Sequence, residues 1–202
     1  MVVHLCSSNP GKLKELALGA QGSGLEVLPL PGLREIATPE ETGSTFEDNA
    51  SDKALYYSQF TSEVAVADDS GLQVDALGGR PGVLSARFAG PDANDAENNA
   101  LLLELMKGEE PRTARFVCVV VAAKAGKRLF TARGEVEGEI LKEPRGAGGF
   151  GYDPLFFYPP LHRSFAELSS GEKLTVSHRG IAMAELLRFL RGYASTRGTP
   201  IG

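Results

Sequence analysis

Two strand-like segments separated by three residues constrain the fold more than any other feature of this sequence. Residues 114–123 and 127–137 flank Lys124, Ala125 and Gly126. Strand-like segments joined by a short connection that contains glycine predict a long antiparallel β-hairpin. Strand and helix patterns lie on both sides of this hairpin in the chain. Together they predict an α/β fold with a mixed β-sheet.

Short apolar runs predict the remaining strands, at residues 2–6, 27–30, 64–67, 72–77 and 155–158. Capping residues and helical spacing predict four helices: one after Asn9, one over residues 46–59, one from Asp92 or Asp95 to near Gly108, and one from Ser177 to Gly192. Residues 34–43 and the glycine-rich stretch 143–153 predict loops. No repeat or linker divides the chain, so we expect one domain over residues 1–192 and a frayed tail over residues 193–202.

Size and charge exclude several classes of protein. A chain of 202 residues can bury a core that needs no disulfide or structural metal. Its net charge of −5 disfavours a broad nucleic-acid-binding face, although a compact anionic ligand can still bind where lysines converge. The longest apolar run, residues 116–123, is too short to cross a membrane, and the N-terminal residues do not form a signal peptide. Cys6 and Cys118 lie in strand-like runs and predict reduced core thiols, hence a cytoplasmic protein.

The segment after the first strand is a candidate phosphate site. It consists of Ser7, Ser8, Asn9, Pro10, Gly11 and Lys12. Asn9 can cap a helix that begins at Pro10, and the free N–H groups of a helix N-terminus suit an anion. Lys12 in the first turn opposes the helix dipole, and an anionic ligand would remove that conflict. A capped helix with a solvated lysine is the alternative interpretation.

Acidic residues form the second candidate site. Asp68 and Asp69 follow a buried strand and precede Ser70, so we expect them at a strand end, where sheet proteins bind ligands. Adjacent residues of a strand face opposite sides, so only one aspartate points into a given site. Glu40 and Glu41 lie in the preceding loop. A carboxylate beside a phosphate site favours Mg²⁺, whereas an Asx turn is the alternative.

Two further motifs suit the base of a nucleotide. The glycine-rich segment 146–154 contains Phe150 and Tyr152, which can stack on a base, although a loop with core aromatics has the same pattern. Pro154 and an aromatic strand follow it, so it is not a dinucleotide-binding motif. Lys173 precedes the last predicted helix, and His178 and Arg179 begin it. The helix dipole favours a neutral His178, which can hydrogen-bond a base edge.

Six motifs in this order resemble the inosine/xanthosine triphosphate pyrophosphatase family of the RdgB type. They are Ser8-Asn9-x-Gly11-Lys12, Glu41-Thr42-Gly43-x-Thr45-Phe46-x-Asp48-Asn49-Ala50, Ala67-Asp68-Asp69-Ser70-Gly71-Leu72, Gly78-Gly79-x-Pro81-Gly82-x-x-Ser85-Ala86-Arg87, Gly149-Phe150-Gly151-Tyr152-Asp153-Pro154 and Ser177-His178-Arg179. The resemblance spans residues 2 to about 191. One departure is visible, since Ser7-Ser8 stands where many members have Thr-Gly.

The resemblance implies a homodimeric, Mg²⁺-dependent enzyme that cleaves ITP, dITP and XTP to the monophosphate and pyrophosphate. The implied fold is an elongated mixed sheet with a long central hairpin, flanking helices and two lobes around a cleft. Residues 7–12 and Ser70 would bind phosphate, with Lys53 as a catalytic cation. Asp69 would be the general base and a metal ligand, with Glu40 as the second metal carboxylate and Glu41 an open alternative.

The same resemblance assigns the base-binding residues, which are Phe150, Gly151, Tyr152, Asp153, Lys173, His178 and Arg179. Two alternatives remain open. A non-catalytic nucleotide sensor would lack the metal carboxylates, which are present here. A pyrophosphatase for pyrimidine or modified nucleotides would share the phosphate chemistry but need other base contacts. Partners beyond the nucleotide and a second copy of the chain are not expected, neither nucleic acid nor a membrane.

Overall fold

The structure, a computed structural model, describes residues 1–196 and contains a seven-stranded mixed sheet in the order β2-β1-β3-β4-β5-β6-β7. The strands are β1 (Val2–Leu5), β2 (Glu26–Pro29), β3 (Val64–Val74), β4 (Thr113–Lys124), β5 (Lys127–Ile140), β6 (Phe156–Tyr158) and β7 (Arg163–Ser164). The helices are α1 (Pro10–Ala20), α2 (Phe46–Tyr57), α3 (Asp95–Leu105), α4 (Ser170–Val176) and α5 (His178–Thr196). Strand β1 pairs in parallel with β2 and β3, whereas β6 is antiparallel to β5 and β7.

The chain forms two compact units, each assembled from separate segments. Unit 1 contains Met1–Asp69, Cys118–Gly134 and the chain from Arg179 onward. Unit 2 contains Ser70–Val117 and Glu135–His178. Strands β3, β4 and β5 therefore contribute residues to both units.

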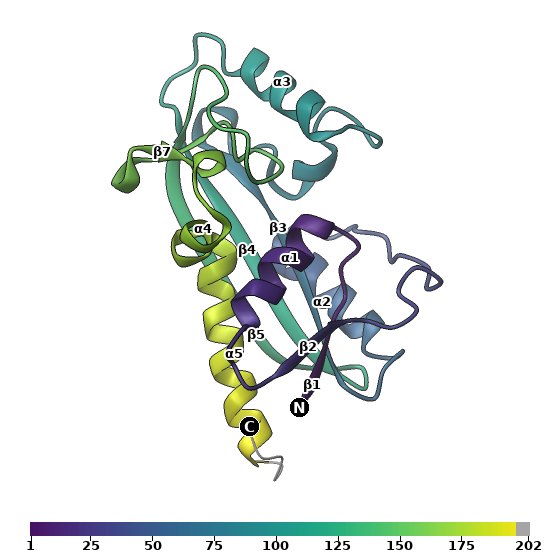
Figure 1. Cartoon of the computed structure of the whole chain (residues 1–202). Helices are drawn as coiled ribbons and strands as arrows, with labels where there is room; N and C mark the ends of the chain where they lie inside the picture. Colours follow the sequence, from purple (N-terminus) through teal and green to yellow (C-terminus); the bar gives the residue numbers. More distant parts are fainter. Residues whose placement is uncertain (197–202) are drawn as a thin grey trace. The chain divides into compact units, whose positions relative to one another are not determined.

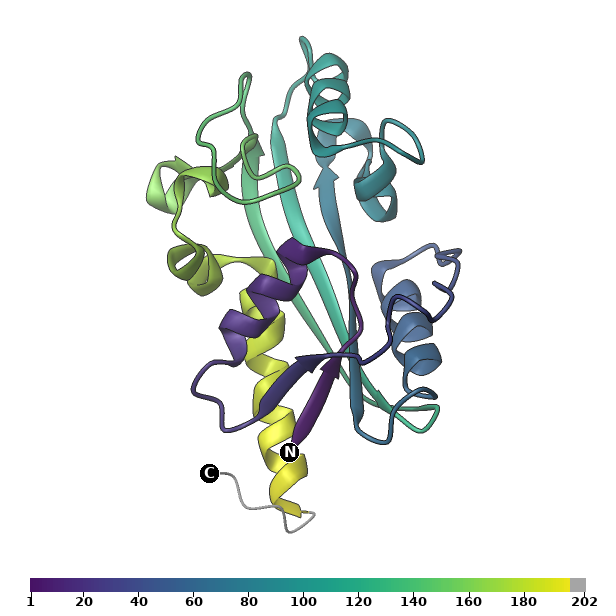
Figure 2. The ribbon, with the colours of Figure 1, turned by 45° about the vertical axis from the view of Figure 1, so that its right-hand side comes forward.

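The main apolar cluster of unit 1 lies on one face of its strands. Alternate residues such as Val3, Leu5 and Val66 pack against α1 and α5, and Phe130 of β5 stacks on Phe189 of α5 with ring centroids 4.5 Å apart. Helices α1 and α5 lie on this face and α2 on the other (Figure 1 and Figure 2). Side chains that alternate along these strands are thus directed toward different helices, which separates the charged groups described below.

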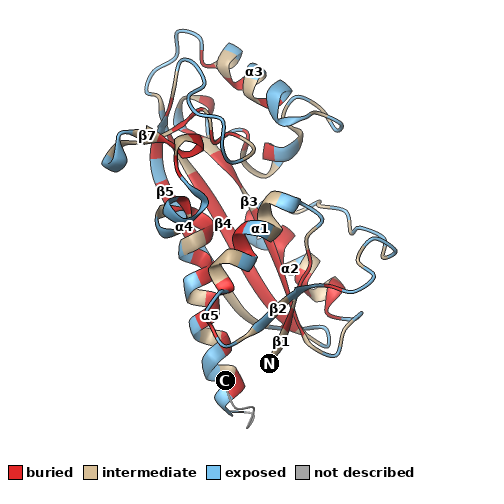
Figure 3. Cartoon of the chain, in the orientation of Figure 1, coloured by how far each residue is buried: buried red, intermediate tan, exposed pale blue. Residues whose placement is uncertain are grey.

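Unit 2 has its own core of aromatic and aliphatic side chains. Phe116 of β4 lies against Phe156 and Phe165, with ring centroids 4.5 and 5.8 Å away. Leu102 and Met106, from and just after α3, close this cluster. The burial of β4 along most of its length is visible in Figure 3. No helix within residues 1–196 is both long enough and apolar enough to cross a bilayer.

Several sequence predictions are confirmed, among them the central β4–β5 hairpin, the helix capped by Asn9 and a helix that begins at Phe46, whose cap in the structure is Thr45. The mixed sheet with flanking helices is also as predicted. Two predictions are wrong. Residues 64–74 form one continuous strand, so Asp68 and Asp69 lie inside β3 rather than at its end. The last helix does not end at Gly192 but continues to Thr196, and the rest of the predicted tail lies outside the described residues.

Candidate active site

The loop after β1 presents the first turn of α1 as a polar surface of unit 1. The Asn9 side chain accepts a hydrogen bond from the Lys12 backbone N–H at 3.0 Å, and Pro10 occupies the first helical turn. Ser7 Oγ accepts a hydrogen bond from the Asn9 N–H at 3.3 Å. Pro10 has no N–H, and the Lys12 and Leu13 N–H groups bond Asn9, so the Gly11 N–H is the group of the first turn that this cap does not use. Ser8, Asn9 and Pro10 are exposed, so a ligand can reach them.

Asp68 balances the charge of Lys12. The Lys12 Nζ lies 3.0 Å from Asp68 Oδ2, so this lysine has a carboxylate partner within the protein. The Arg179 Nε lies 3.7 Å from the same oxygen, and Arg179 also donates a hydrogen bond to Glu15. Burial alone would raise the pKa of Asp68, but the charges of Lys12 and Arg179 outweigh it and lower the pKa to about 2. Asp68 is therefore a fixed negative charge that orients cations.

Asp69 lies on the opposite face of β3, as strand alternation predicts. Its Oδ2 accepts a hydrogen bond from Asn49 Nδ2 at 3.1 Å, and Lys53 Nζ is 3.5 Å from its Oδ1. Burial raises the pKa of Asp69, because removal from water disfavours the charged carboxylate and nearby Lys53 and Lys12 only partly offset this. A carboxylate with a raised pKa is a better proton acceptor than a free aspartate.

Lys53 joins the loop before α2 to this carboxylate. Its Nζ bonds Glu41 Oε1 at 2.6 Å. Burial alone would lower the pKa of Lys53, but the surrounding carboxylates, led by Asp69, outweigh it and raise the pKa. Lys53 is therefore a charged, half-buried cation. Glu40, the neighbour of Glu41, is exposed.

Asn49 is a residue whose role the sequence motifs did not reveal. Besides its bond to Asp69, its Oδ1 accepts a hydrogen bond from the Gly43 N–H at 2.8 Å. A Cβ atom at Gly43 would lie 2.6 Å from that same oxygen, so the loop passes close to Asn49. Asn49 thereby ties the loop that carries Glu41 to β3. The only sequence signal was its place in the motif that ends at Ala50.

The carboxylates of unit 1 suit a hard divalent cation whose remaining ligands are phosphate oxygens of a bound substrate. Among residues 1–196, no three His, Cys, Asp or Glu side chains form a cluster that would hold a metal by itself. Mg²⁺ is commonly bound by only one or two carboxylates together with substrate phosphates. Asp69 with Glu41 or Glu40 supplies such an oxygen-donor set.

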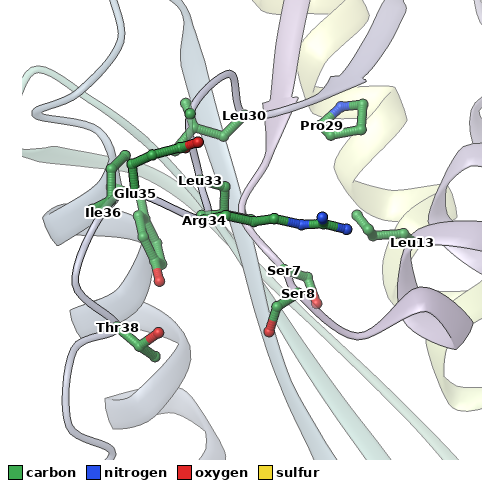
Figure 4. Close-up of a pocket in the computed structure, with 12 residues that line it drawn as sticks. Ser7, Ser8, Leu13, Pro29, Leu30, Leu33, Arg34, Glu35, Ile36 and Thr38 are labelled. Carbon is green, nitrogen blue, oxygen red and sulfur yellow. The ribbon is translucent and has the colours of Figure 1, made fainter.

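A pocket of about 630 Å³ lies beside the phosphate-binding loop (Figure 4). Ser7 and Ser8 line one side, and residues of the segment after β2, including Arg34 and Thr38, line the other. This volume lies within the range of small-molecule sites. Arg34 extends across the pocket in Figure 4. The sequence predicted only a loop at this segment and gave no reason to select Arg34.

In unit 2, Asp153 and Lys173 form a buried ion pair under Phe150. Lys173 Nζ lies 2.5 Å from Asp153 Oδ2, and the side chains are only 5% and 2% exposed. The same oxygen accepts a hydrogen bond from the Phe150 N–H at 2.9 Å. Lys173 Nζ is 4.8 Å from the centroid of the Phe150 ring. The loop comes so close that a Cβ at Gly149 would meet Asp153 Oδ2 at 2.0 Å, which explains the glycine.

The other residues predicted to contact the base, His178, Tyr152 and Arg179, do not all lie in the same unit. His178 stacks on Phe116 in unit 2, with ring centroids 4.7 Å apart. Tyr152 is buried, and its hydroxyl donates to the Ser85 carbonyl at 2.8 Å. Arg179 belongs to unit 1, where it is 2% exposed and pairs with Glu15 and Asp68 rather than presenting a free edge to a base.

Ser70 lies in β3 directly after Asp69 and is the first residue of unit 2. The structure thus groups the predicted site residues into two sets. Apart from Ser70, the predicted phosphate and carboxylate residues lie in unit 1, and an aromatic residue beside a buried ion pair lies in unit 2. This arrangement is typical of an α/β protein that binds a small anionic ligand.

Known proteins agree with that class. The profile of the Ham1 family matches residues 3–189, so the chain belongs to the Ham1 family. A protein named dITP/XTP pyrophosphatase from Exiguobacterium sp. is 49% identical and aligns over 95% of this chain and 100% of its own. Another protein of that name, from Acidobacterium capsulatum, is 48% identical over 95% and 99% of the two chains. The structure of a HAM1 protein from Coxiella burnetii superposes with a TM-score of 0.86 at 39% identity, covering 95% of this chain and 99% of that one.

Proposed function

We propose that this protein hydrolyses non-standard purine nucleoside triphosphates (dITP, ITP and XTP) to the nucleoside monophosphate and pyrophosphate. The observation that carries the proposal is the buried Asp69 carboxylate, held between Asn49 and Lys53. It occurs in a chain nearly half identical to proteins named dITP/XTP pyrophosphatase.

The triphosphate binds at the start of α1. Residues 7–12 offer the Gly11 N–H, the hydroxyl groups of Ser7 and Ser8, and the Lys12 ammonium. Ser70, which follows Asp69 in β3, is the other hydroxyl that we assign to phosphate. Asp68 holds Lys12 in place through the 3.0 Å ion pair. Arg179, buried against Asp68 and Glu15, supports this arrangement, and its burial favours a positioning role over contact with a base edge.

Asp69 is the general base. It takes a proton from a water molecule whose oxygen attacks the α-phosphorus, and the bond from that phosphorus to the bridging oxygen breaks to release pyrophosphate. The Asn49 amide and the Lys53 ammonium hold this carboxylate in place for the transfer. Lys53 remains protonated and offsets negative charge that develops on the phosphates.

The cofactor is Mg²⁺, held by Asp69 with either Glu40 or Glu41. The bond between Glu41 and Lys53 supports Glu41, because it brings this carboxylate to the lysine that also faces Asp69. When bound, Mg²⁺ neutralises phosphate charge and acidifies water.

The base binds at the ion pair of unit 2. Phe150 stacks on the ring, and Gly151, Asp153 and buried Tyr152 shape the loop. Lys173 and His178 donate hydrogen bonds to the 6-oxo group of hypoxanthine or xanthine. Adenine carries an amino group at that position, which is a hydrogen-bond donor like the protein groups that would face it. Binding adenine would leave these buried polar groups unpaired, so we expect the site to reject it strongly.

The active form is a homodimer in the cytoplasm, as the family resemblance implies. The two free cysteines support a reducing compartment, since both are buried thiols within unit 1.

The test measures pyrophosphate release with Mg²⁺ from ITP, XTP, ATP, GTP and dTTP, with EDTA as the control. We expect metal-dependent release from ITP and XTP far above that from ATP and GTP. Release of orthophosphate would contradict the reaction, and preference for dTTP would favour a pyrimidine enzyme. Tight ITP binding without hydrolysis would indicate a nucleotide sensor.

A further inference from the structure

Helix α3 holds one residue of the base-binding loop from both sides. The Gly151 N–H donates to Asp95 Oδ2 at 2.6 Å, and the Gly151 carbonyl accepts from Asn99 Nδ2 at 2.8 Å. Asp95 and Asn99 are four residues apart on α3, so both side chains face the same way. One face of α3 therefore holds both the N–H and the carbonyl group of Gly151.

The helix that supplies these bonds is itself well anchored in unit 2. Its first turn is closed by a capping box between Asn94 and Glu97. Asn98, which is buried, accepts from the Ala89 N–H at 2.8 Å and donates to the Ala86 carbonyl at 3.1 Å. Helix α3 is thus a fixed support for the loop, as positioning residues require.

Gly151 itself has open space beside it, since a Cβ atom built there would meet no heavy atom within 4 Å. A hollow of about 480 Å³ lies where α3 faces residues 147–151, and it is lined by Asp95, Asn99 and Leu103 from the helix. Gly151 has a positive φ of 60°, a conformation that glycine adopts without cost but does not enforce. The two hydrogen bonds to α3 are therefore the contacts that fix the orientation of the Gly151 peptide groups.

We propose that Asp95 and Asn99 are positioning residues that fix the Phe150 ring for stacking on the nucleotide base. This inference rests on the proposed function, which places the base at Phe150. Phe150 lies between two attachments: its own N–H bonds Asp153, and the next residue bonds α3. Loss of the α3 attachment frees one side of the ring while the phosphate and carboxylate residues of unit 1 keep their contacts.

The test compares the steady-state kinetics of Asp95→Ala and Asn99→Ala with wild type on ITP. We expect KM to rise about three- to tenfold in each variant, the size of one lost hydrogen bond, with kcat within about twofold. The inhibition constant of IMP should rise in parallel, whereas inhibition by inorganic pyrophosphate, which needs no base contact, should not change. Asp92→Ala, at an exposed acid three residues before Asp95, is the matched control.

Two conservative variants separate positioning from general damage to the fold. Asp95→Asn keeps an oxygen that accepts from the Gly151 N–H and should restore KM to near the wild-type value. Asn99→Asp keeps the size of the side chain but loses the donor and should behave like Asn99→Ala. Thermal melting monitored by circular dichroism verifies that each variant is folded before its kinetics are compared.

Unchanged KM in both Asn99 variants would overturn the inference. It would also be overturned if kcat and pyrophosphate inhibition weakened together with KM, since that pattern indicates a general structural defect. A wild-type protein without ITP hydrolysis would instead reject the proposed function, and this outcome is read before any variant is compared.

Discussion

The two units treat charge in different ways. In unit 1, Asp68 and Asp69 are neighbours in one strand, yet the pKa of Asp68 is lowered to about 2 and that of Asp69 is raised. In unit 2, one lysine and one carboxylate pair at 2.5 Å beneath an aromatic ring. Unit 1 thus contains two neighbouring carboxylates in contrasting environments, whereas unit 2 contains a buried ion pair. Under the proposed function, this difference assigns chemistry to one compact unit and selectivity to the other.

The largest effect should come from the proton acceptor of unit 1. Asp69→Asn keeps the shape of the side chain but removes its ability to accept a proton. We expect kcat for ITP to fall by about 10²- to 10⁴-fold while nucleotide binding persists. Pyrophosphate release and equilibrium binding of ITP measure the two effects. Asp52→Asn, on the exposed side of α2, is the control, and substantial turnover by Asp69→Asn would remove Asp69 as the base.

The next effect should appear in the stability of unit 2. Lys173→Met leaves the Asp153 carboxylate buried without its cation, a change that costs about 3–5 kcal/mol in comparable buried pairs. Urea denaturation gives the change in the free energy of unfolding, and Lys142→Met at an exposed site is the control. The double change Lys173→Met with Asp153→Asn should recover part of the loss. Equal stability of Lys173→Met and wild type would show that this pair is not required for the fold of unit 2.

A smaller effect, confined to substrate affinity, should follow from Phe150→Ala. Base–aromatic stacking contributes about 1–3 kcal/mol, so KM for ITP should rise about 5- to 150-fold with little change in kcat. Phe60→Ala, at a ring that is 50% exposed in unit 1, is the matched control. A fall in kcat without a rise in KM would contradict the division of roles between the units.

The smallest effect concerns the two thiols, which both report on unit 1. Burial raises the pKa of Cys6 and of Cys118 to about 12. At pH 8 the folded protein should therefore react with a thiol reagent such as DTNB only after denaturant is added. Because the folded pKa exceeds the unfolded value of about 8.5, the thiols' contribution to stability is complete below that pH and is lost as the pH rises towards 12. Rapid labelling of the native protein would show that unit 1 opens independently.

Local signals were sufficient for much of the fold. The β4–β5 hairpin follows from two apolar runs and a glycine-containing turn, and α1 follows from Asn9 before Pro10. Helix α4 was missed, although Ser169 and Glu172 form a capping box, because the helix has only seven residues. Strand β3 was divided at Gly71, where the sequence resembles a turn. In the fold, Gly71 stays in the strand, and Ser85 Oγ lies 2.3 Å from the position of a Cβ atom there.

The sequence predicted which residue types form the site, but it did not predict which residues contact one another there. Alternation along a strand predicted that Asp68 and Asp69 face opposite ways, and the structure confirms it. The partner of Arg179 was not predictable, because Glu15 is 164 residues away in the chain. The attachment of Gly151 to Asp95 and Asn99 was missed for the same reason. Such contacts depend on tertiary packing, which no local pattern encodes.

The segmented make-up of unit 1 has a consequence for biosynthesis. Its three segments are separated by the whole of unit 2, and the last begins only at Arg179. While the chain emerges from a ribosome, unit 1 therefore lacks the helix that covers its core and Arg179, the second cation beside Asp68 after Lys12. Contacts of such long sequence separation form late and slowly. Unit 1 can become complete only when nearly the entire chain has been made.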